Sequence, residues 1–336
     1  MYRFYGLAAR LRQSFGERVQ KIPLDFGFTC PNRDGSISRK GCIFCSPQGS
    51  GSGMHDLSMS IPEQWAHWQE KLSKLYTAKR YLAYLQSYSN TYCSHEELKC
   101  ALDQLDGLPG LAGICIGTRP DCLDDDKLAL IKDLGLKETW LDLGLQTSNN
   151  VTLERINRGH TAEQFAEAVK MAHAHGLDVC AHLIAGLPGE STEDFLESVR
   201  FLNGLPIAGI KFHNLFVGKG TPLKKIYDAG EYTPIEQDEY IDALVKAISI
   251  LRTDIVIHRL KADAIPGGLV APEWVRMKRK VLNEIEKDMK AKGIWQGCAR
   301  PDAPDEPPLW YGPEGMPPAA GEGEKRSFSY TSQVAR

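Results

Sequence analysis

Short apolar runs recur along the 336 residues at an almost constant spacing, and this spacing limits the folds open to the chain. The runs cover residues 19–24, 81–85, 113–117, 139–145, 178–184 and 209–215. From the second run on, successive starts lie roughly 30 residues apart, which is the length of one βα unit. The runs are mostly apolar and do not alternate strictly with polar residues, as expected for a parallel strand covered on both faces. The sequence therefore predicts an α/β fold in which six βα units form a partial (β/α)6 barrel.

Paired polar residues mark where several of the intervening helices begin. The pairs are Ser94 with Glu97, Thr161 with Gln164 and, as a near match, Ser191 with Asp194. In such a capping box the two side chains bond the backbone N–H groups that the first helical turn leaves without partners. Helices are therefore predicted to start at these positions, between the strands.

After Arg252 the βα rhythm stops and the character of the chain changes. Residues 273–292 fit one charged amphipathic helix. Residues 301–336 are rich in Pro, Gly, Glu and Ser, a composition typical of disorder. We predict a barrel core over residues 1–253, a helical extension over 254–300 and a disordered tail over 301–336.

The composition fits a globular protein without a membrane segment. At a net charge of −3, coating of nucleic acid through bulk charge is not expected, although a local basic patch stays possible. No stretch approaches the ~18 apolar residues of a membrane span, and residues 1–20 lack the apolar centre of a signal peptide. We therefore expect a cytoplasmic protein whose nine cysteines are thiols or metal ligands rather than disulfides.

Three cysteines follow the first predicted strand: Cys30, Cys42 and Cys45, with the spacing C-x11-C-x2-C. A structural zinc site and an electron-carrying [4Fe–4S] cluster both take four protein ligands, so three cysteines leave one metal position open. One interpretation is a zinc site completed by His55, and the other is a cluster-binding loop. The second is favoured because the active sites of α/β barrels lie on the loops at the carboxyl ends of the strands.

Several further motifs match one enzyme family over residues 1–295 when they are taken together with the cysteines. They are QSYSNTY at 86–92, GTRPD at 117–121, LGLQT at 143–147, NRGH at 157–160 and AGLPG at 185–189. With them the chain resembles radical S-adenosylmethionine (SAM) enzymes. Within these it resembles the YhcC-like bacterial group, which is related to the elongator catalytic subunit and the oxygen-independent coproporphyrinogen oxidases. The gap of 11 residues departs from the usual C-x3-C-x2-C spacing but is shared by the YhcC-like group.

The resemblance implies a [4Fe–4S] cluster in which Cys30, Cys42 and Cys45 each bind one iron, and SAM binds the fourth. It also implies that the reduced cluster cleaves SAM and generates a 5′-deoxyadenosyl radical. A flavodoxin- or ferredoxin-type reductant would supply the electron. The cofactor carries this chemistry, while the protein directs the radical. Phe44, next to the last cysteine, is expected to cover a bound nucleobase.

The resemblance further implies SAM-binding residues at the strand ends. Most family members carry a Gly-Gly-Glu-like run after strand two, which this sequence lacks, and Ser87 and Asn90 are the expected replacements. Gln146, at the end of strand four, is expected to hydrogen-bond the ribose. The alternative for Gln146 is a polar residue that merely lines the barrel.

Two other candidate SAM contacts have ordinary structural alternatives. Gly186 and Pro188 end strand five, where backbone would approach the adenine, and the alternative is a common strand-to-helix turn. Arg119 lies just past strand three, where a positive group suits the SAM carboxylate. The alternative for Arg119 is a structural pair with Asp121.

Three hypotheses describe the target of the chemistry. The first is a radical SAM enzyme that acts on a wobble uridine of tRNA, as the elongator-like relatives do. The second is a radical SAM enzyme for a small metabolite or a porphyrin-like molecule, and the third is a zinc-dependent RNA-binding protein. Basic residues between positions 276 and 292 would offer RNA a phosphate-binding edge, or form a solvated face with ion pairs. Some of Lys211, His213 and Asn214 in strand six should face the barrel cavity.

Overall fold

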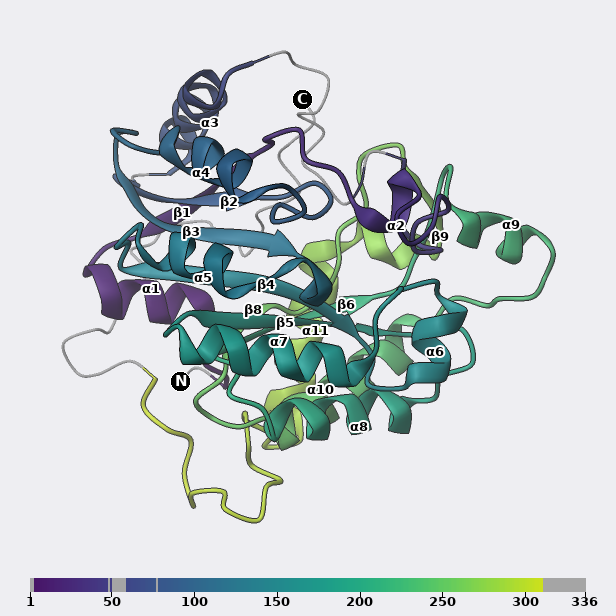
Figure 1. Ribbon diagram of the computed structural model, residues 1–336. Coiled ribbons are helices and arrows are strands. Elements are labelled where there is room, and N and C mark those ends of the chain that lie inside the picture. Colours follow the sequence, from purple (N-terminus) through teal and green to yellow (C-terminus); the bar gives the residue numbers. More distant parts are fainter. Residues whose placement is uncertain (1–2, 48, 50–58, 77, 311–336) are drawn as a thin grey trace.

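A parallel sheet of seven strands forms the centre of the molecule (Figure 1). The computed structural model describes residues 3–47, 49, 59–76 and 78–310. In the sheet the strands follow the order β1-β2-β3-β4-β5-β6-β8, and every neighbouring pair is parallel. Their bounds are β1 (Val19–Leu24), β2 (Arg80–Leu85), β3 (Leu111–Thr118), β4 (Glu138–Gln146), β5 (Asp178–Ala185), β6 (Gly209–Asn214) and β8 (Val256–Arg259). The predicted α/β partial barrel is confirmed, with each predicted run forming a strand.

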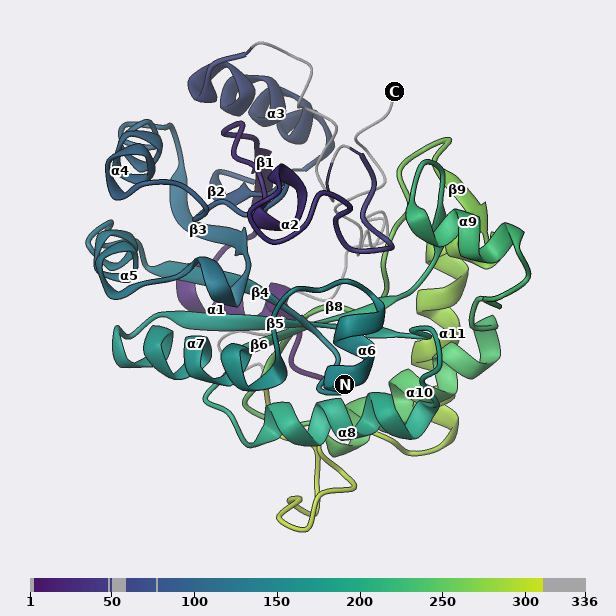
Figure 2. The same ribbon diagram turned by 45° about the vertical axis from the view of Figure 1, so that its right-hand side comes forward.

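Helices cover the outer side of the curved sheet, and Figure 2 shows them as an arc from α3 to α8. They are α3 (Ile61–Leu75), α4 (His95–Asp103), α5 (Asp125–Lys132), α7 (Ala162–Ala174) and α8 (Thr192–Asn203), with α10 (Gln237–Ile250) packed on α8. The main hydrophobic core lies between these helices and the strands. None of the helices in the described part of the chain combines the length and apolar character needed to cross a lipid bilayer.

All predicted helix starts are present. The capping boxes of Ser94, Thr161 and Ser191 each form with both side chains engaged. A further box at Ser60 starts α3. The amphipathic helix predicted over 273–292 is divided: η3 (Glu273–Arg276) is a 3-10 turn, and α11 (Lys278–Ala291) follows after Met277.

The N-terminal segment lies across the two edge strands of the sheet. Ahead of α1 (Leu7–Phe15), Gly6 forms a parallel bridge with Ile257 of β8, and α1 itself contacts both β1 and β8. A second, smaller core gathers there on the concave face, with Leu11 against Trp140 and Val256. The strand β8, which sequence analysis did not predict, therefore completes the barrel wall opposite β1.

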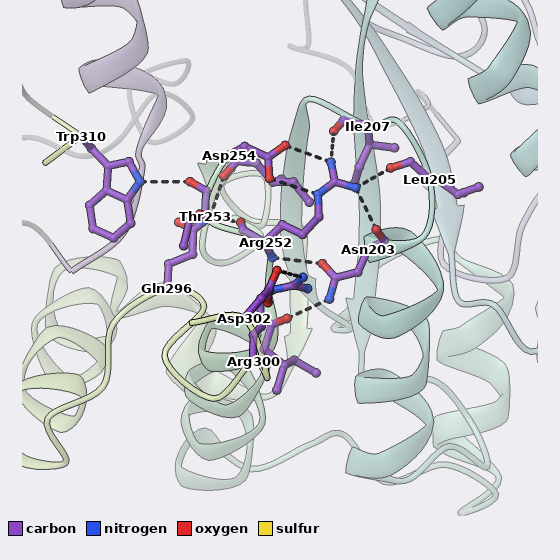
Figure 3. A network of polar contacts seen from close by, with 12 residues as sticks. Asn203, Leu205, Ile207, Arg252, Thr253, Asp254, Gln296, Arg300, Asp302 and Trp310 are labelled. Atoms are coloured by element: carbon purple, nitrogen blue, oxygen red, sulfur yellow. Dashed lines mark hydrogen bonds and ion pairs between the residues drawn. The ribbon is translucent and has the colours of Figure 1, made fainter. Parts of the chain in front are cut away.

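The C-terminal extension is tied to the barrel by a polar network (Figure 3). Gln296 of the extension donates through Nε2 to the carbonyl of Arg252 at 2.6 Å. The Arg252 guanidinium in turn donates to the carbonyls of Asn203 and Leu205 at 2.8 and 2.7 Å. Trp310 is buried, and its indole N–H donates to the carbonyl of Thr253 at 3.0 Å (Figure 3). The tail predicted over 301–336 is thus packed on the barrel at Trp310, and residues 311–336 lie outside the described residues. The division at 253/254 stays a prediction.

The remaining elements surround the carboxyl ends of the strands or lie beside them. They are α2 (Pro31–Asp34), η2 (Pro120–Cys122), α6 (Asn150–Arg155), α9 (Pro222–Asp228) and a small antiparallel sheet of β7 (Val217–Gly218) with β9 (Leu269–Ala271). Figure 2 shows α2, α6 and α9 around one end of the barrel. The cysteine-bearing loop starts at this end, because α2 begins directly after Cys30.

Candidate functional site

The loop between Cys30 and Cys42 is folded back on itself. Cys30 precedes α2, whose proline fits the first helical turn. The N–H of Ile37 donates to the carbonyl of Pro31 at 2.8 Å, and that of Gly41 to the carbonyl of Asn32 at 2.7 Å. These bonds fold the chain back onto α2. The two ends of the 11-residue stretch between Cys30 and Cys42 therefore lie close together in space, although the stretch is long in sequence.

Arg33 holds the chain that leads away from the cysteines. Its guanidinium donates to the carbonyl of Ser46 at 2.6 Å and to that of Pro47 at 3.0 Å. The N–H of Cys45 donates to the carbonyl of Cys42 at 3.0 Å, which closes a tight turn. The second and third cysteines are therefore fixed by backbone bonds and by one arginine.

Two donors from different parts of the chain point at the sulfur of Cys42. Asn32 Nδ2 and Arg158 Nη1 each lie 3.6 Å from Cys42 Sγ, and the side chain of Cys42 is buried. Arg158 also donates to the carbonyl of Gly144 in β4 at 2.7 Å. A guanidinium and an amide N–H are the kinds of donor that a metal-bound thiolate accepts.

The NRGH segment, residues 157–160, is hydrogen-bonded to the cysteine loop. Asn157 takes the uncommon positive φ of 54° and donates to the carbonyl of Gly41 at 2.6 Å. His160 lies 3.0 Å from the Gly144 carbonyl through Nε2, and burial, followed by the charge of Arg158, lowers its pKa to about 3. Sequence analysis noted this motif but missed that it supports the cysteine loop. The signal was only the motif itself, because its partners are more than a hundred residues away.

The spacing of the three thiols bears on the choice between a single zinc ion and a cluster, and the cluster stays a prediction. A tetrahedral zinc site with Zn–S bonds of 2.3 Å brings its sulfurs to about 3.8 Å from one another. Among the described residues, the set of three ligand atoms within 4.8 Å is that of Asp142, Cys180 and His258, so the loop cysteines are more widely spaced. Burial, followed by the neighbouring Cys42 thiol, raises the pKa of Cys45 to about 11, so a metal would have to displace its proton. His55 lies outside the described residues.

The loop after β2 holds the two residues predicted to replace the usual SAM-binding run. Ser87 has a φ of 90°, and its hydroxyl donates to Asp25 Oδ2 at 2.7 Å. Asn90 Nδ2 donates to the carbonyl of Gly117 at 2.8 Å. Between them, the Ser89 hydroxyl is buried without a hydrogen-bond partner among the described residues. A strained loop with one unpaired hydroxyl fits a ligand site, and Ser89 is a candidate that sequence analysis did not single out.

Gln146 ends β4 with a φ of 79° and a buried side chain. A side chain at Gly144 would overlap the Gln146 amide and the Arg158 guanidinium, so the glycine makes room for both. Gln146 therefore lies near Arg158, which donates to the sulfur of Cys42 in the cysteine loop. Its predicted bond to the ribose stays a prediction.

Arg119 is buried, and its donors already have partners. They bond both carboxylate oxygens of Asp121, at 2.9 and 2.8 Å, and the carbonyls of Arg158 and Gly159. This arrangement matches the structural alternative stated above, since Arg119 anchors the NRGH segment. A contact between Arg119 and SAM stays a prediction.

The turn after β5 has structural partners of its own. Gly186 has a φ of 81°, a side chain there would meet Ile235 at 2.8 Å, and its carbonyl accepts from the Tyr232 hydroxyl. The carbonyl of Pro188 accepts from Arg155 at 2.6 Å. These contacts explain the glycine without a ligand, and the predicted adenine contacts of Gly186 and Pro188 stay predictions. Phe44, half-buried against the core, is likewise untested as a nucleobase cover.

Charged side chains gather on the concave face, below the level of the cysteine loop. Lys211 Nζ lies 2.5 Å from Asp142 Oδ2 and 3.0 Å from the Tyr84 hydroxyl, and both members of the ion pair are buried. The rings of His182 and His213 lie 5.2 Å apart. The expectation that part of the strand-six triplet faces the cavity is confirmed for Lys211, whereas Asn214 accepts the N–H of Ala262.

The set of Asp142, Cys180 and His258 belongs to this face, but it does not suit a metal. Asp142 is already bound by Lys211, and burial raises the pKa of the Cys180 thiol well above its usual range. Cations beside the carboxylate would also repel a second positive charge. We assign no ion to it.

Sequence profiles match most of the chain. That of the Radical SAM superfamily matches residues 29–202, and that of the Radical_SAM C-terminal domain matches residues 207–291. The chain therefore belongs to the radical SAM superfamily and is an enzyme of this class. It is similar to Protein YhcC of Escherichia coli (strain K12), with 38% identity over 292 residues, which are 86% of this chain and 93% of that protein. The YhcC-like resemblance is confirmed, and the hypothesis of a zinc-dependent RNA-binding protein does not agree with this membership.

Two further similarities extend beyond this group. The chain is 31% identical over 195 residues to tRNA uridine(34) acetyltransferase of Methanocaldococcus jannaschii, which are 56% of this chain but 34% of that protein. The structure of the archaeal Methanocaldococcus infernus Elp3 superimposes with a TM-score of 0.63 at 20% identity, covering 83% of this chain and 64% of that one. At this identity the structural likeness shows a common fold.

Proposed function

We propose that this chain holds a [4Fe–4S] cluster through Cys30, Cys42 and Cys45 and uses it to cleave SAM reductively. The observation that carries the proposal is the pair of N–H donors, from Asn32 and Arg158, on the buried sulfur of Cys42. Donors of this kind tune the potential of a cluster and orient its ligands. A flavodoxin- or ferredoxin-type protein is the proposed reductant.

When bound, the cluster and SAM would supply a 5′-deoxyadenosyl radical, and the chain's own residues hold and enclose the reactants. Asn157 and Arg33 keep the cysteine loop closed through carbonyl groups. The Ser89 hydroxyl would give SAM a polar contact, with Ser87, Asn90, Arg119 and Gln146 as further proposed contacts. Gly186 and Pro188 would form the adenine side, with Phe44 over the base.

For the target we propose a uridine of tRNA. The support is the similarity to proteins named tRNA uridine(34) acetyltransferase, which this chain matches over about a third of their length. The basic residues of the C-terminal helix add little support, because Lys278 is paired with Asp263, and Lys292 with Asp288 and Asp242. Arg279 and Lys290 are exposed and remain available to phosphate groups.

The first experiment tests the cofactor. The protein is reconstituted anaerobically with iron and sulfide, reduced, and incubated with SAM. We expect about four irons per chain and release of 5′-deoxyadenosine. Iron binding without 5′-deoxyadenosine, or a colourless protein with stoichiometric zinc, would overturn the proposal.

The second experiment tests the target. Nucleosides from the tRNA of a deletion strain and its parent are compared by mass spectrometry, after aerobic and after anaerobic growth. Loss of a modified uridine that a plasmid copy restores is the expected result. Identical profiles under both conditions would contradict a role in tRNA and favour the small-molecule alternative.

A further inference from the structure

The concave face of β4, β5, β6 and β8 and its immediate surroundings hold more cations than carboxylates. Lys211 and Arg259 belong to β6 and β8, Lys21 belongs to β1, and Lys261 and Lys278 follow the end of β8. The carboxylates among them are Asp142 and Asp263. The whole chain has a net charge of −3, so this excess is local. Uncompensated charge away from bulk water is unfavourable unless an opposite charge joins it.

Ion pairs account for only part of the excess. Asp142 binds Lys211, and Asp263 binds both Lys261 and Lys278. Lys21 lies 5.0 Å from the centre of the Tyr84 ring. These pairs leave Arg259 without an ion pair to a carboxylate among the described residues, whereas the charge of Lys21 acts on Asp142 without a direct ion pair.

Arg259 is the cation best placed to meet a ligand. It ends β8, its register partner in β6 is Lys211, and its side chain is half-buried. Its guanidinium has no hydrogen bond or ion pair with the described part of the chain. A guanidinium presents a planar fork of donors that matches a carboxylate or a phosphate group.

Two uncharged histidines lie next to Arg259. Burial, and then the charge of Arg259, lowers the pKa of His213 well below its ordinary value, and burial followed by Lys211 lowers that of His182 to about 4. The Nε2 atoms of both rings are shielded from water and have no hydrogen-bond partner in the described residues, and Asp142 Oδ1 lies 3.6 Å from His182 Nε2, too far for a bond. A native interior seldom leaves this many polar atoms unpaired, so a missing partner explains them.

This face lies close to the proposed radical site. In the sheet register Gly144 pairs with His182, and Asp142 lies two residues before Gly144 on the same face. Two residues of a strand span roughly 7 Å. Arg158 bonds both the Gly144 carbonyl and the sulfur of Cys42. The charged face, which begins at Asp142, therefore lies about two residues along β4 from the position where Arg158 contacts the strand.

We propose that the concave face binds a small molecule through a carboxylate or phosphate group, held by Arg259 with His213 and His182 beside it and Lys211 beneath. That this molecule takes part in the radical reaction, alongside the tRNA target, rests on the proposed function. The site would select small anionic compounds, and an uncharged analogue would bind weakly. Asp142 would remain the counter-ion of Lys211.

Calorimetric titration with inorganic phosphate and with succinate tests the binding, on the full-length protein before and after anaerobic reconstitution. We expect millimolar or tighter affinity for one of them, and a loss of about tenfold or more in Arg259→Gln. Arg200→Gln, an exposed arginine of α8 that is ion-paired with Glu193 and Glu197, is the matched control and should bind as the wild type does. His213→Gln should also weaken binding, and it provides the answer if Arg259→Gln does not fold.

Three results would overturn the inference. One is the absence of binding by the wild-type protein up to about 10 mM of either anion, which is the weak limit of specific recognition. Another is equal affinity in the Arg259→Gln and Arg200→Gln proteins. The third is displacement of the anion by SAM, which would assign the site to the SAM carboxylate. Failure of the proposed function is seen separately, as missing iron or missing 5′-deoxyadenosine, because the titration needs no turnover.

Discussion

The cysteine loop and the concave face of β4, β5, β6 and β8 are both rich in polar side chains. The two regions differ in how many of these side chains have hydrogen-bond partners. In the loop, the donors of Arg33, Asn157 and Arg119 bond carbonyl groups at ordinary distances. On the concave face, Arg259 lacks a partner in the described structure, and the rings of His182 and His213 have unpaired nitrogen atoms. Most polar atoms of the loop are paired, although Asn32 Oδ1 and Arg33 Nε lack partners in the described structure, whereas the concave face leaves a charged group and two rings unpaired.

The difference follows from what the backbone offers. An irregular loop leaves many carbonyl groups free of secondary structure, so nearby side-chain donors can satisfy them. In a sheet the ladder already uses these carbonyls, and polar side chains on its face must pair with one another or with a ligand. We therefore expect the loop to be rigid before its cofactor binds and the concave face to gain order from its ligand.

The largest expected difference between the two regions is seen when one cysteine is removed from each. Cys42→Ala should abolish iron binding and 5′-deoxyadenosine formation, because one iron loses its ligand. Cys180→Ala, on the buried concave face, should keep the wild-type iron content. Iron and sulfide assays on the reconstituted proteins measure both. Equal iron in the two variants would remove Cys42 from the cluster.

Breaking the buried ion pair tests how strongly the concave face depends on its few internal partners. Lys211→Met leaves Asp142 buried without its cation, so we expect the free energy of unfolding to fall by about 3 to 5 kcal/mol. Lys224→Met removes the exposed pair with Asp228 in α9 and should leave the unfolding midpoint unchanged. Guanidinium denaturation followed by circular dichroism makes the measurement. Equal midpoints would mean that the buried pair is solvated.

A change of pH should affect the concave face through His182. Its folded pKa of about 4 lies below the ordinary value of about 6.5. Between these values the unfolded chain takes up a proton that the folded protein does not, so stability falls as the pH decreases. From pH 7 to pH 5 we expect this residue to lower the free energy of unfolding by about 2 kcal/mol.

The His182→Gln variant should lose that part of the pH dependence. His95→Gln, at the exposed start of α4, is the control and should keep the wild-type slope. Chemical denaturation at the two pH values checks this. A slope that is the same in all three proteins would show that His182 is protonated in the folded state.

The smallest expected effect concerns the donors around Cys42. Asn32→Ala removes one N–H donor at 3.6 Å from the sulfur, while Arg158 remains. Loss of a donor makes the oxidised cluster relatively more stable, so the midpoint potential should fall, by roughly 40 mV for a bond worth about 1 kcal/mol. Spectroscopic redox titration measures the shift, with Asn150→Ala on exposed α6 as the control. A potential equal to that of the control would assign Asn32 only to the bond with the Asn157 carbonyl.

The positions of six strands could be predicted from the sequence because each is a local, mostly apolar run. Parallel strands buried on both faces need no long-range information to be recognised. β8 was missed because it is short, only Val256–Arg259, and ends in the polar residues His258 and Arg259. Its place in the sheet depends on pairing with β6 and on Gly6 from the other end of the chain. Capping boxes, in contrast, lie within four residues, and those of Ser94, Thr161 and Ser191 were found, while that of Ser60 was missed.

Sequence alone determined the strand period, the trio of cysteines and the family, since these depend on spacing along the chain. Only the tertiary structure decided that Arg158 reaches Cys42, that Arg119 is engaged by carbonyl groups, and that Arg259 lies beside two unpaired histidines. Such contacts join residues more than thirty positions apart. Their geometry is set by how the strands pack and twist together, and no local pattern in the sequence records it.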